Sequence, residues 1–188
     1  MNKIYVGLDI DETLIVTERY YALNDRPDNA ELYFNCDPFK YALHVRDGVF
    51  DFLKYIDDNF ELFFYTRATK DYAEQIVNHL GYGDKPLFHR EDTIRVEVPA
   101  FGYDKQRLIY QKKDLFKIAE RLGTTINNIV FIDDVSNDDE IIPTKCVIEI
   151  PEMIINEPDN DLLIILQHFK DGMKLNASID YFRSLQFI

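Results

Sequence analysis

The sequence predicts a doubly wound, Rossmann-like α/β fold with a mainly parallel sheet of five strands. Short apolar runs alternate along the chain with segments of helical periodicity, which is the order expected of β-α units. The apolar runs lack a clean polar/apolar alternation, as in strands that are buried on both faces of a parallel sheet. Several of these runs end in polar residues. Since parallel strands present their carboxyl ends at one edge of the sheet, we expect a ligand site at that edge.

The first half of the chain is predicted to contain two strands, with a flap inserted after the first. Ile4–Leu8 is the first strand, and Glu61–Thr66 is the second. Residues 15–45 are rich in Tyr, Asn, Asp and Pro and predict a turn-rich flap that covers a site. Asp47 precedes the apolar face of a helix that starts near Val49, and Asp is a favoured N-cap residue, so we expect Asp47 to cap this helix.

The second half of the chain continues the alternation and adds a β-hairpin. Alternating residues around a Pro/Gly segment predict the hairpin, and Gly residues mark the ends of two helices. The predicted elements are a helix at Lys70–Leu80, a strand at Pro86–Phe88, the hairpin at about 92–112, a helix at Asp114–Leu122, strands at Ile129–Asp133 and Cys146–Ile150, and a helical tail at about 158–188. We expect all of these elements to belong to one domain.

Size and charge restrict the class of protein. A chain of 188 residues suits one well-buried domain. The net charge of −13 argues against direct nucleic-acid binding and against binding to an anionic membrane surface, because both need clustered Lys and Arg. No apolar run approaches a membrane span, and Cys36 and Cys146 form no metal-binding or disulfide spacing. We expect a soluble intracellular protein, either cytoplasmic or nuclear.

Polar residues end three of the predicted strands. Asp9 and Asp11 follow the first strand, Thr66 the second, and Asp133 and Asp134 the fourth. Two acids as close as Asp9 and Asp11 repel each other, so a cation holds them ionised or one of them keeps a proton. Alone, they are also compatible with an acidic turn that caps a helix. The same sheet edge bears such residues three times, which favours a catalytic or metal site over a turn.

These residues resemble the motifs of the haloacid dehalogenase (HAD) superfamily of aspartate-nucleophile phosphatases. Its four signatures occur in the expected order as Asp9-x-Asp11-x-Thr13, Thr66, Lys113 within Lys112-Lys113-Asp114-Leu115, and Asp133-Asp134. The resemblance covers roughly residues 4 to 150. It implies a HAD-type fold, with the flap after the first strand and the inserted hairpin as additions to the sheet.

Within that superfamily the chain is most similar to FCP/SCP-type phosphatases, which act on phosphoserine in the RNA polymerase II C-terminal domain. The strings that carry this similarity are Val45-Arg46-Asp47-Gly48-Val49, Tyr65-Thr66 followed by Tyr72-Ala73, and Leu87-Phe88-His89-Arg90-Glu91. Two features depart from the family pattern. Asp133-Asp134-Val135-Ser136 replaces the usual Asp-Asn-Ser-Pro string, and the segment between Arg90 and Lys113 is longer than usual.

The resemblance implies a magnesium-dependent mechanism with an aspartyl-phosphate intermediate. Asp9 is the expected nucleophile and a Mg²⁺ ligand, Asp11 supplies a main-chain carbonyl ligand, and Asp133 completes the protein ligand set. Asp134 is an additional candidate ligand. The side chain of Asp11 is the expected general acid and base. Mg²⁺ fits such a site because it prefers oxygen ligands and binds through few carboxylates.

The resemblance also implies which residues hold the substrate. Thr66 and Lys113 are expected to act in catalysis by binding the phosphoryl oxygens, while Lys112, its neighbour, is the alternative lysine. Arg67 and Arg90 are further candidates for substrate contact. The implied substrate is a phosphorylated protein or peptide. Two other readings remain open: a HAD phosphatase for a small metabolite or a nucleic-acid 3′-phosphate, and a catalytically inactive scaffold of the same fold.

Overall fold

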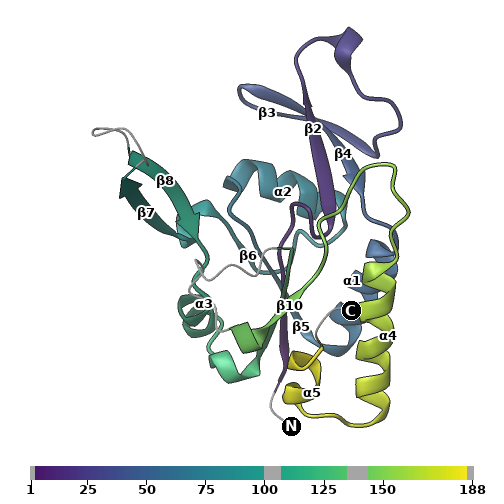
Figure 1. Ribbon diagram of the computed structural model, residues 1–188, viewed down its shortest axis with the longest axis vertical. Helices are drawn as coiled ribbons and strands as arrows, with labels where there is room; N and C mark the ends of the chain where they lie inside the picture. The colour runs from purple at the N-terminus through teal and green to yellow at the C-terminus, as the bar shows by residue number, and fades with distance from the viewer. Residues whose placement is uncertain (1–2, 100–106, 135–143, 186–188) are drawn as a thin grey trace.

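A five-stranded parallel sheet lies at the centre of the molecule (Figure 1), a computed structural model that describes residues 3–99, 107–134 and 144–185. The strands run in the order β10-β9-β1-β5-β6, and every neighbouring pair is parallel. Their bounds are Tyr5–Leu8 for β1, Glu61–Tyr65 for β5, Leu87–Phe88 for β6, Ile129–Asp133 for β9 and Val147–Glu149 for β10. This arrangement confirms the predicted sheet.

Helices cover both faces of the sheet, as expected of a doubly wound fold. Side chains such as Val6 and Leu8 of β1 join one large core, and Phe63 and Phe131 join a smaller one on the opposite face. The helices that contribute to the large core are α1 (Val49–Asn59), α2 (Lys70–His79), α4 (Asp161–Lys174) and α5 (Ile179–Arg183), and α3 (Leu115–Arg121) contributes to the smaller one. In the described ranges, none of these helices is both long and apolar enough to cross a membrane.

Gly7 allows two aromatic rings to close over the middle of the sheet. Gly7 of β1 pairs with Phe63 of β5 and with Phe131 of β9. The two rings stack with their centroids 6.4 Å apart and their planes at 23°. A Cβ atom at position 7 would lie 2.2 Å from a carbon of the Phe63 ring, which is closer than non-bonded atoms approach. The missing side chain therefore makes room for the aromatic core between the sheet and α3.

The flap is a three-stranded antiparallel sheet rather than the turn-rich segment expected. Its strands are β2 (Ile15–Tyr20), β3 (Leu32–Cys36) and β4 (Phe39–Val45), in the order β2-β4-β3. The flap extends beyond the carboxyl edge of the main sheet (Figure 1). Polar residues occupy much of β2, so this strand lacks the apolar run that identifies buried strands. Pairing with the more apolar β4 determines its structure.

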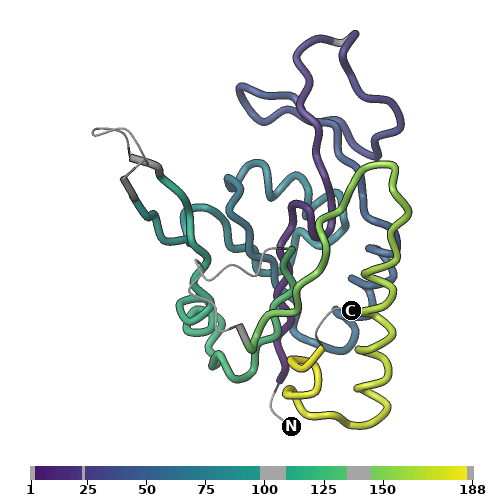
Figure 2. The backbone as a smooth tube through the Cα atoms, in the orientation of Figure 1, coloured from purple at the N-terminus to yellow at the C-terminus, as the bar shows by residue number. Residues whose placement is uncertain are grey.

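The inserted hairpin is present where the sequence predicted it. Its strands are β7 (Ile94–Pro99) and β8 (Arg107–Lys112), which pair antiparallel with Ile94 opposite Lys112. The backbone trace shows that the hairpin and the flap extend from different parts of the molecule (Figure 2). The hairpin ends one residue before Lys113, so it leads directly into the segment that carries this lysine.

The start of α1 corrects one prediction. Gly48, not Asp47, is the N-cap residue, and no side chain caps this helix. Gly48 has a φ of +77°, a left-handed conformation that glycine adopts most readily, and its carbonyl accepts a hydrogen bond from the Phe52 N–H at 3.0 Å. The sequence does not reveal this backbone conformation. The prediction of Asp47 as the N-cap, which relied on residue preference alone, is therefore wrong by one position. Asp114, in contrast, caps α3 by accepting from Phe116 N at 3.0 Å and Lys117 N at 3.2 Å.

Arg46 connects the loop after β1 to the segment that precedes α4. Its side chain is fully buried. Its Nε donates to Asp159 at 2.5 Å, and its Nη2 donates to Asp161 at 3.1 Å and to the Pro151 carbonyl at 2.7 Å. Its Nη1 donates to the Thr13 carbonyl at 3.0 Å. One planar guanidinium thus satisfies acceptors from three parts of the chain, a geometry that lysine does not reproduce.

Candidate active site

A polar cavity opens at the carboxyl edge of the main sheet, below the flap. Its volume is about 640 Å³. Asp9, Asp11 and Thr66 reach it from the ends of β1 and β5. Thr17 and Arg19 line it from β2 of the flap. The cavity is therefore built by sheet and flap together, at the position where α/β folds bind ligands.

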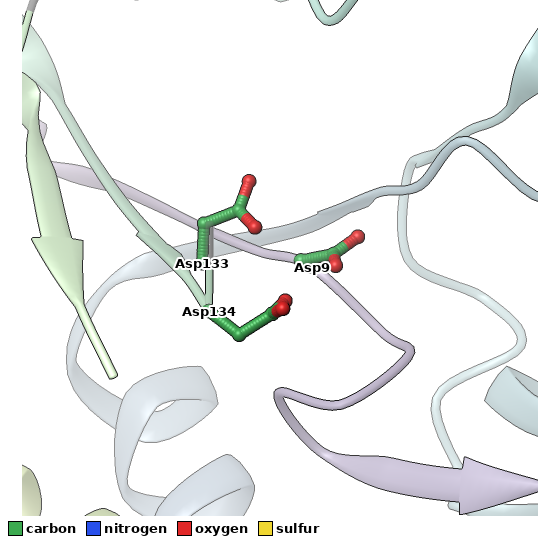
Figure 3. A group of neighbouring side chains, drawn as sticks. All are labelled: Asp9, Asp133 and Asp134. Carbon is green, nitrogen blue, oxygen red and sulfur yellow. The ribbon is translucent and has the colours of Figure 1, made fainter. Parts of the chain in front are cut away.

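Three carboxylates meet on the floor of this region. Asp9, Asp133 and Asp134 each place one carboxylate oxygen within 4.8 Å of the others, and Asp133 and Asp134 turn from the end of β9 toward Asp9 (Figure 3). The Asp9 N–H donates to the Ile132 carbonyl at 2.9 Å, which fixes the loop after β1 against β9. Thr13 supports the group, since its hydroxyl lies 3.2 Å from Asp134 Oδ1 and accepts from the Asp134 N–H at 3.0 Å.

Lys113 lies between two of these carboxylates. Its Nζ is 2.8 Å from Asp9 Oδ1 and 2.6 Å from Asp133 Oδ2, and only 1% of its side chain is exposed. Burial alone would lower the pKa of Lys113, but the charges of Asp9 and Asp133 outweigh burial and raise this pKa. Lys113 is thus a buried ammonium group. Lys112 lies outside this group, with its Nζ 5.5 Å from the centre of the Tyr110 ring.

The carboxylates are electrostatically suited to a cation. Burial raises the pKa of Asp9, the charges of Asp133 and Asp11 raise it further, and Lys113 opposes this shift. Burial and the charge of Asp133 raise the pKa of Asp134 to about 6. Asp9 Oδ1 is buried, and the contact that it makes is the ion pair with the Lys113 ammonium group, 2.8 Å away. A divalent cation would stabilise the ionised form of these oxygens, so this donor set fits a hard metal ion.

Asp11 lies beside this group and makes different contacts. The Tyr72 hydroxyl donates to Asp11 Oδ1 at 2.5 Å, and the Thr66 hydroxyl is 3.5 Å from Asp11 Oδ2. Burial raises the pKa of Asp11, although the Tyr72 hydrogen bond and the charge of Lys113 oppose the shift. The Thr66 hydroxyl also accepts from the Ala68 N–H at 3.0 Å. The side chain of Asp11 is not one of the three clustered carboxylates, and its raised pKa favours a proton carrier.

The two candidate arginines line the same cavity. Arg67 and Arg90 follow Thr66 and β6, respectively. Arg90 is held in place by its own backbone and side chain, since its N–H donates to the Ala68 carbonyl at 2.8 Å and its Nε donates to the Arg67 carbonyl at 3.0 Å. The structure therefore brings both arginines to the wall of the cavity.

Sequence reasoning missed Tyr72, Thr17 and Arg19 as site residues. Tyr72 lay within one of the family-like strings, so its position was a usable signal. Thr17 and Arg19 carried no such signal, because their place depends on how the flap strands pair. Arg19 extends over the flap aromatics, with its guanidinium 4.5 Å from the centre of the Phe39 ring.

The parallel sheet, the flap after β1 and the carboxylate–lysine cluster at one edge define a HAD-type α/β domain. The family model for NLI interacting factor-like phosphatases matches residues 4–180, so the chain belongs to this phosphatase family. No curated protein sequence matches the chain.

Solved structures agree with this fold. One similar structure is the fission yeast RNA polymerase II CTD phosphatase Fcp1 bound to beryllium fluoride, with 17% identity and a TM-score of 0.58 over 95% of this chain. Another Fcp1 structure, described as an essential RNA polymerase II CTD phosphatase, shows 19% identity and a TM-score of 0.57, again over 95% of this chain. This chain covers 52% and 51% of those two chains, about half of their length. At these identities the likeness concerns the fold alone.

Proposed function

We propose that the chain is a Mg²⁺-dependent phosphatase that removes phosphate from phosphoserine or phosphothreonine in a peptide. One observation carries the proposal: the Asp9 carboxylate lies among Lys113, Asp133 and Asp134, while Asp11, with a raised pKa, stands beside it at the same cavity. A nucleophile with a buried cation nearby and a separate proton carrier is what phosphoryl transfer to a carboxylate requires.

The proposed metal ligands are the carboxylates of Asp9 and Asp133, the main-chain carbonyl of Asp11 and, as an additional ligand, Asp134. When bound, the ion would neutralise the charge that otherwise repels a phosphate monoester from Asp9. Lys113 supplies a second, permanent positive charge on the floor of the site. Its ammonium group and the Thr66 hydroxyl would hold the phosphoryl oxygens. Both groups would thereby stabilise the negative charge on these oxygens in the transition state.

The proposed reaction has two steps. In the first, an oxygen of Asp9 forms a bond to phosphorus while the bond from phosphorus to the ester oxygen breaks, and the ester oxygen takes the bonding electrons and a proton from Asp11. In the second, Asp11, now a carboxylate, removes a proton from water as the water oxygen bonds to phosphorus. The bond between phosphorus and Asp9 breaks, and inorganic phosphate and free Asp9 result.

The proposed substrate class rests on the family and on the shape of the site. Both similar structures are described as RNA polymerase II CTD phosphatases. The cavity of about 640 Å³ is wide enough for a phosphorylated side chain and part of the adjoining peptide, and Arg67 and Arg90 line its wall. Both arginines are suited to carboxylate or phosphate groups next to the scissile phosphate.

A single comparison tests the proposed reaction. We expect p-nitrophenyl phosphate hydrolysis by the wild type with Mg²⁺, loss of hydrolysis in EDTA, and no turnover above background for Asp9→Asn. Beryllium fluoride, which binds one of the similar structures, should raise the melting temperature of the wild type with Mg²⁺ but not that of Asp9→Asn. Absence of metal-dependent turnover in the wild type would refute the enzymatic function. The remaining hypothesis would then be a catalytically inactive scaffold of the same fold.

A second comparison tests the substrate. We expect phosphoserine and phosphothreonine peptides to show a higher kcat/KM than a panel of phosphorylated metabolites and 3′-phosphorylated oligonucleotides. Metabolites that match or exceed the peptides would contradict the proposed substrate class while leaving the chemistry intact.

A further inference from the structure

The Asp11 carboxyl group is held from two sides by different parts of the fold. Oδ1 accepts from the Tyr72 hydroxyl at 2.5 Å, and Oδ2 faces the Thr66 hydroxyl at 3.5 Å. Tyr72 belongs to α2, whereas Thr66 directly follows β5 and lines the cavity. The two oxygens of Asp11 are therefore not equivalent, since Oδ1 faces α2 and Oδ2 faces the residue that we expect to bind phosphate.

A third hydroxyl extends this contact into the flap. Thr17 of β2 lies 2.8 Å from the Tyr72 hydroxyl. Because the Tyr72 hydroxyl has one proton and donates it to Asp11, the Thr17 hydroxyl is the donor in the contact with Tyr72. The result is an ordered chain of hydrogen bonds from the flap through Tyr72 to Asp11.

The Tyr72 ring is fixed by packing. It is 7% exposed, and its ring centroid lies 5.1 Å from that of Tyr41 and 5.6 Å from that of Phe34, both in the flap. A side chain that is held by two aromatic neighbours loses little additional freedom when its hydroxyl makes a hydrogen bond. Such a group is well suited to orient a catalytic carboxyl group.

We propose that Tyr72 is a positioning residue that orients the Asp11 carboxyl group so that Oδ2 delivers the proton to the leaving oxygen, and that Thr17 of the flap holds Tyr72 in this role. The inference rests on the proposed phosphatase function and concerns its first step. In that step the proton moves from Asp11 Oδ2 to the ester oxygen as the bond from phosphorus to this oxygen breaks. The hydrogen bond from Tyr72 to Oδ1 persists through the step, so Oδ2, beside the Thr66 hydroxyl, is the oxygen that delivers the proton.

Leaving groups of different acidity separate this role from a structural one. The 4-nitrophenolate ion is a stable anion at neutral pH and departs without a proton, whereas phenol and serine need one. We expect Tyr72→Phe to lower kcat/KM by about 10- to 100-fold for phenyl phosphate and for a phosphoserine peptide. For p-nitrophenyl phosphate we expect a loss of less than about threefold. The quantity kcat/KM is the appropriate measure because it reports the first step and not the hydrolysis of the intermediate.

Three further variants control the experiment. Thr17→Val should show a smaller loss with the same dependence on leaving group, and Thr17→Ser, which keeps the hydroxyl, should restore wild-type ratios. Tyr55→Phe removes a hydroxyl from α1 outside the cavity and should leave the ratio of the substrates unchanged. Thermal unfolding of each variant will show whether its fold is intact.

The outcomes distinguish the two proposals. If the wild type hydrolyses no phosphomonoester, the proposed function fails. If the wild type is active and Tyr72→Phe lowers kcat/KM equally for all leaving groups, or changes only KM, the positioning role is refuted while the proposed function stands.

Discussion

Replacing Arg46 with methionine should lower the free energy of unfolding by about 3 to 5 kcal/mol, the usual cost of removing one partner from a buried ion pair. The Arg46 side chain has 0% exposure, while its partners Asp159 and Asp161 are 12% and 26% exposed. Methionine fills much of the same volume but leaves both carboxylates without their cation. It also leaves the carbonyls of Thr13 and Pro151 without a donor.

The partial exposure of the two aspartates places the expected cost near the lower limit, because water can solvate them once Arg46 is gone. For a domain of this size, a loss of about 3 kcal/mol corresponds to a fall in melting temperature of roughly 6–12 °C. Urea unfolding followed by circular dichroism measures the free energy, and calorimetry measures the melting temperature. Arg46→Lys should recover only part of the loss, since one ammonium group cannot satisfy all of these acceptors.

Arg95→Met is the matched control for this experiment. Arg95 pairs with Glu97 on the hairpin, but its side chain is 60% exposed, so its removal should cost less than about 0.5 kcal/mol. A loss below about 1 kcal/mol for Arg46→Met, similar to that of the control, would refute the view that Arg46 joins the loop after β1 to the C-terminal segment.

Three further predictions concern the sheet and the carboxylate cluster. Gly7→Ala should cost about 2 kcal/mol or more in urea unfolding, because its Cβ would lie 2.2 Å from the Phe63 ring; wild-type stability would contradict the close packing. Lys113→Met should abolish turnover and, in EDTA, cost about 3 kcal/mol of stability, whereas Lys112→Met should keep turnover; equal effects on turnover would contradict the assignment. The pKa of Asp134 is raised to about 6 from its ordinary 3.8, so its contribution to stability is present below about pH 4 and lost as pH rises through 6. In EDTA at pH 7.5, Asp134→Asn should therefore be about 1 kcal/mol more stable than the wild type, after allowance for solvent screening. A difference in stability that does not shrink toward pH 5 would contradict this prediction.

The sequence predicted the central sheet well, because its strands are continuous apolar runs. Phe63 and Phe131, for example, lie in runs that need no knowledge of their partners to be recognised. The convergence of Asp9 and Asp133 followed from the topology of a parallel sheet, and the structure places them in one group with Asp134. The Lys113-Asp114-Leu115 pattern favours Lys113 over Lys112, and the structure buries Lys113 in that group.

The features that escaped prediction depend on backbone conformation and on pairing between distant segments. The positive φ of Gly48 decides where α1 starts, so the neighbouring Asp47 is not the N-cap residue, although its residue type predicts that it is. The polar strand β2 is a strand only because β4 lies beside it. For the same reason, sequence patterns could not place Thr17 beside Tyr72, since the contact joins the flap to a helix 55 positions further along the chain.

The flap leaves the main body and returns to it at neighbouring points. The Arg46 N–H donates to the Leu14 carbonyl at 2.9 Å, and Ile15 pairs with Val45 where the flap sheet begins. A segment with such closely spaced ends can be exchanged for one of another length without moving the chain on either side. Residues 15–45 therefore form a unit for protein engineering. A flap grafted from another family member should alter which phosphorylated substrates enter, while the cluster of Asp9, Asp133 and Asp134 at the edge of the sheet keeps its position.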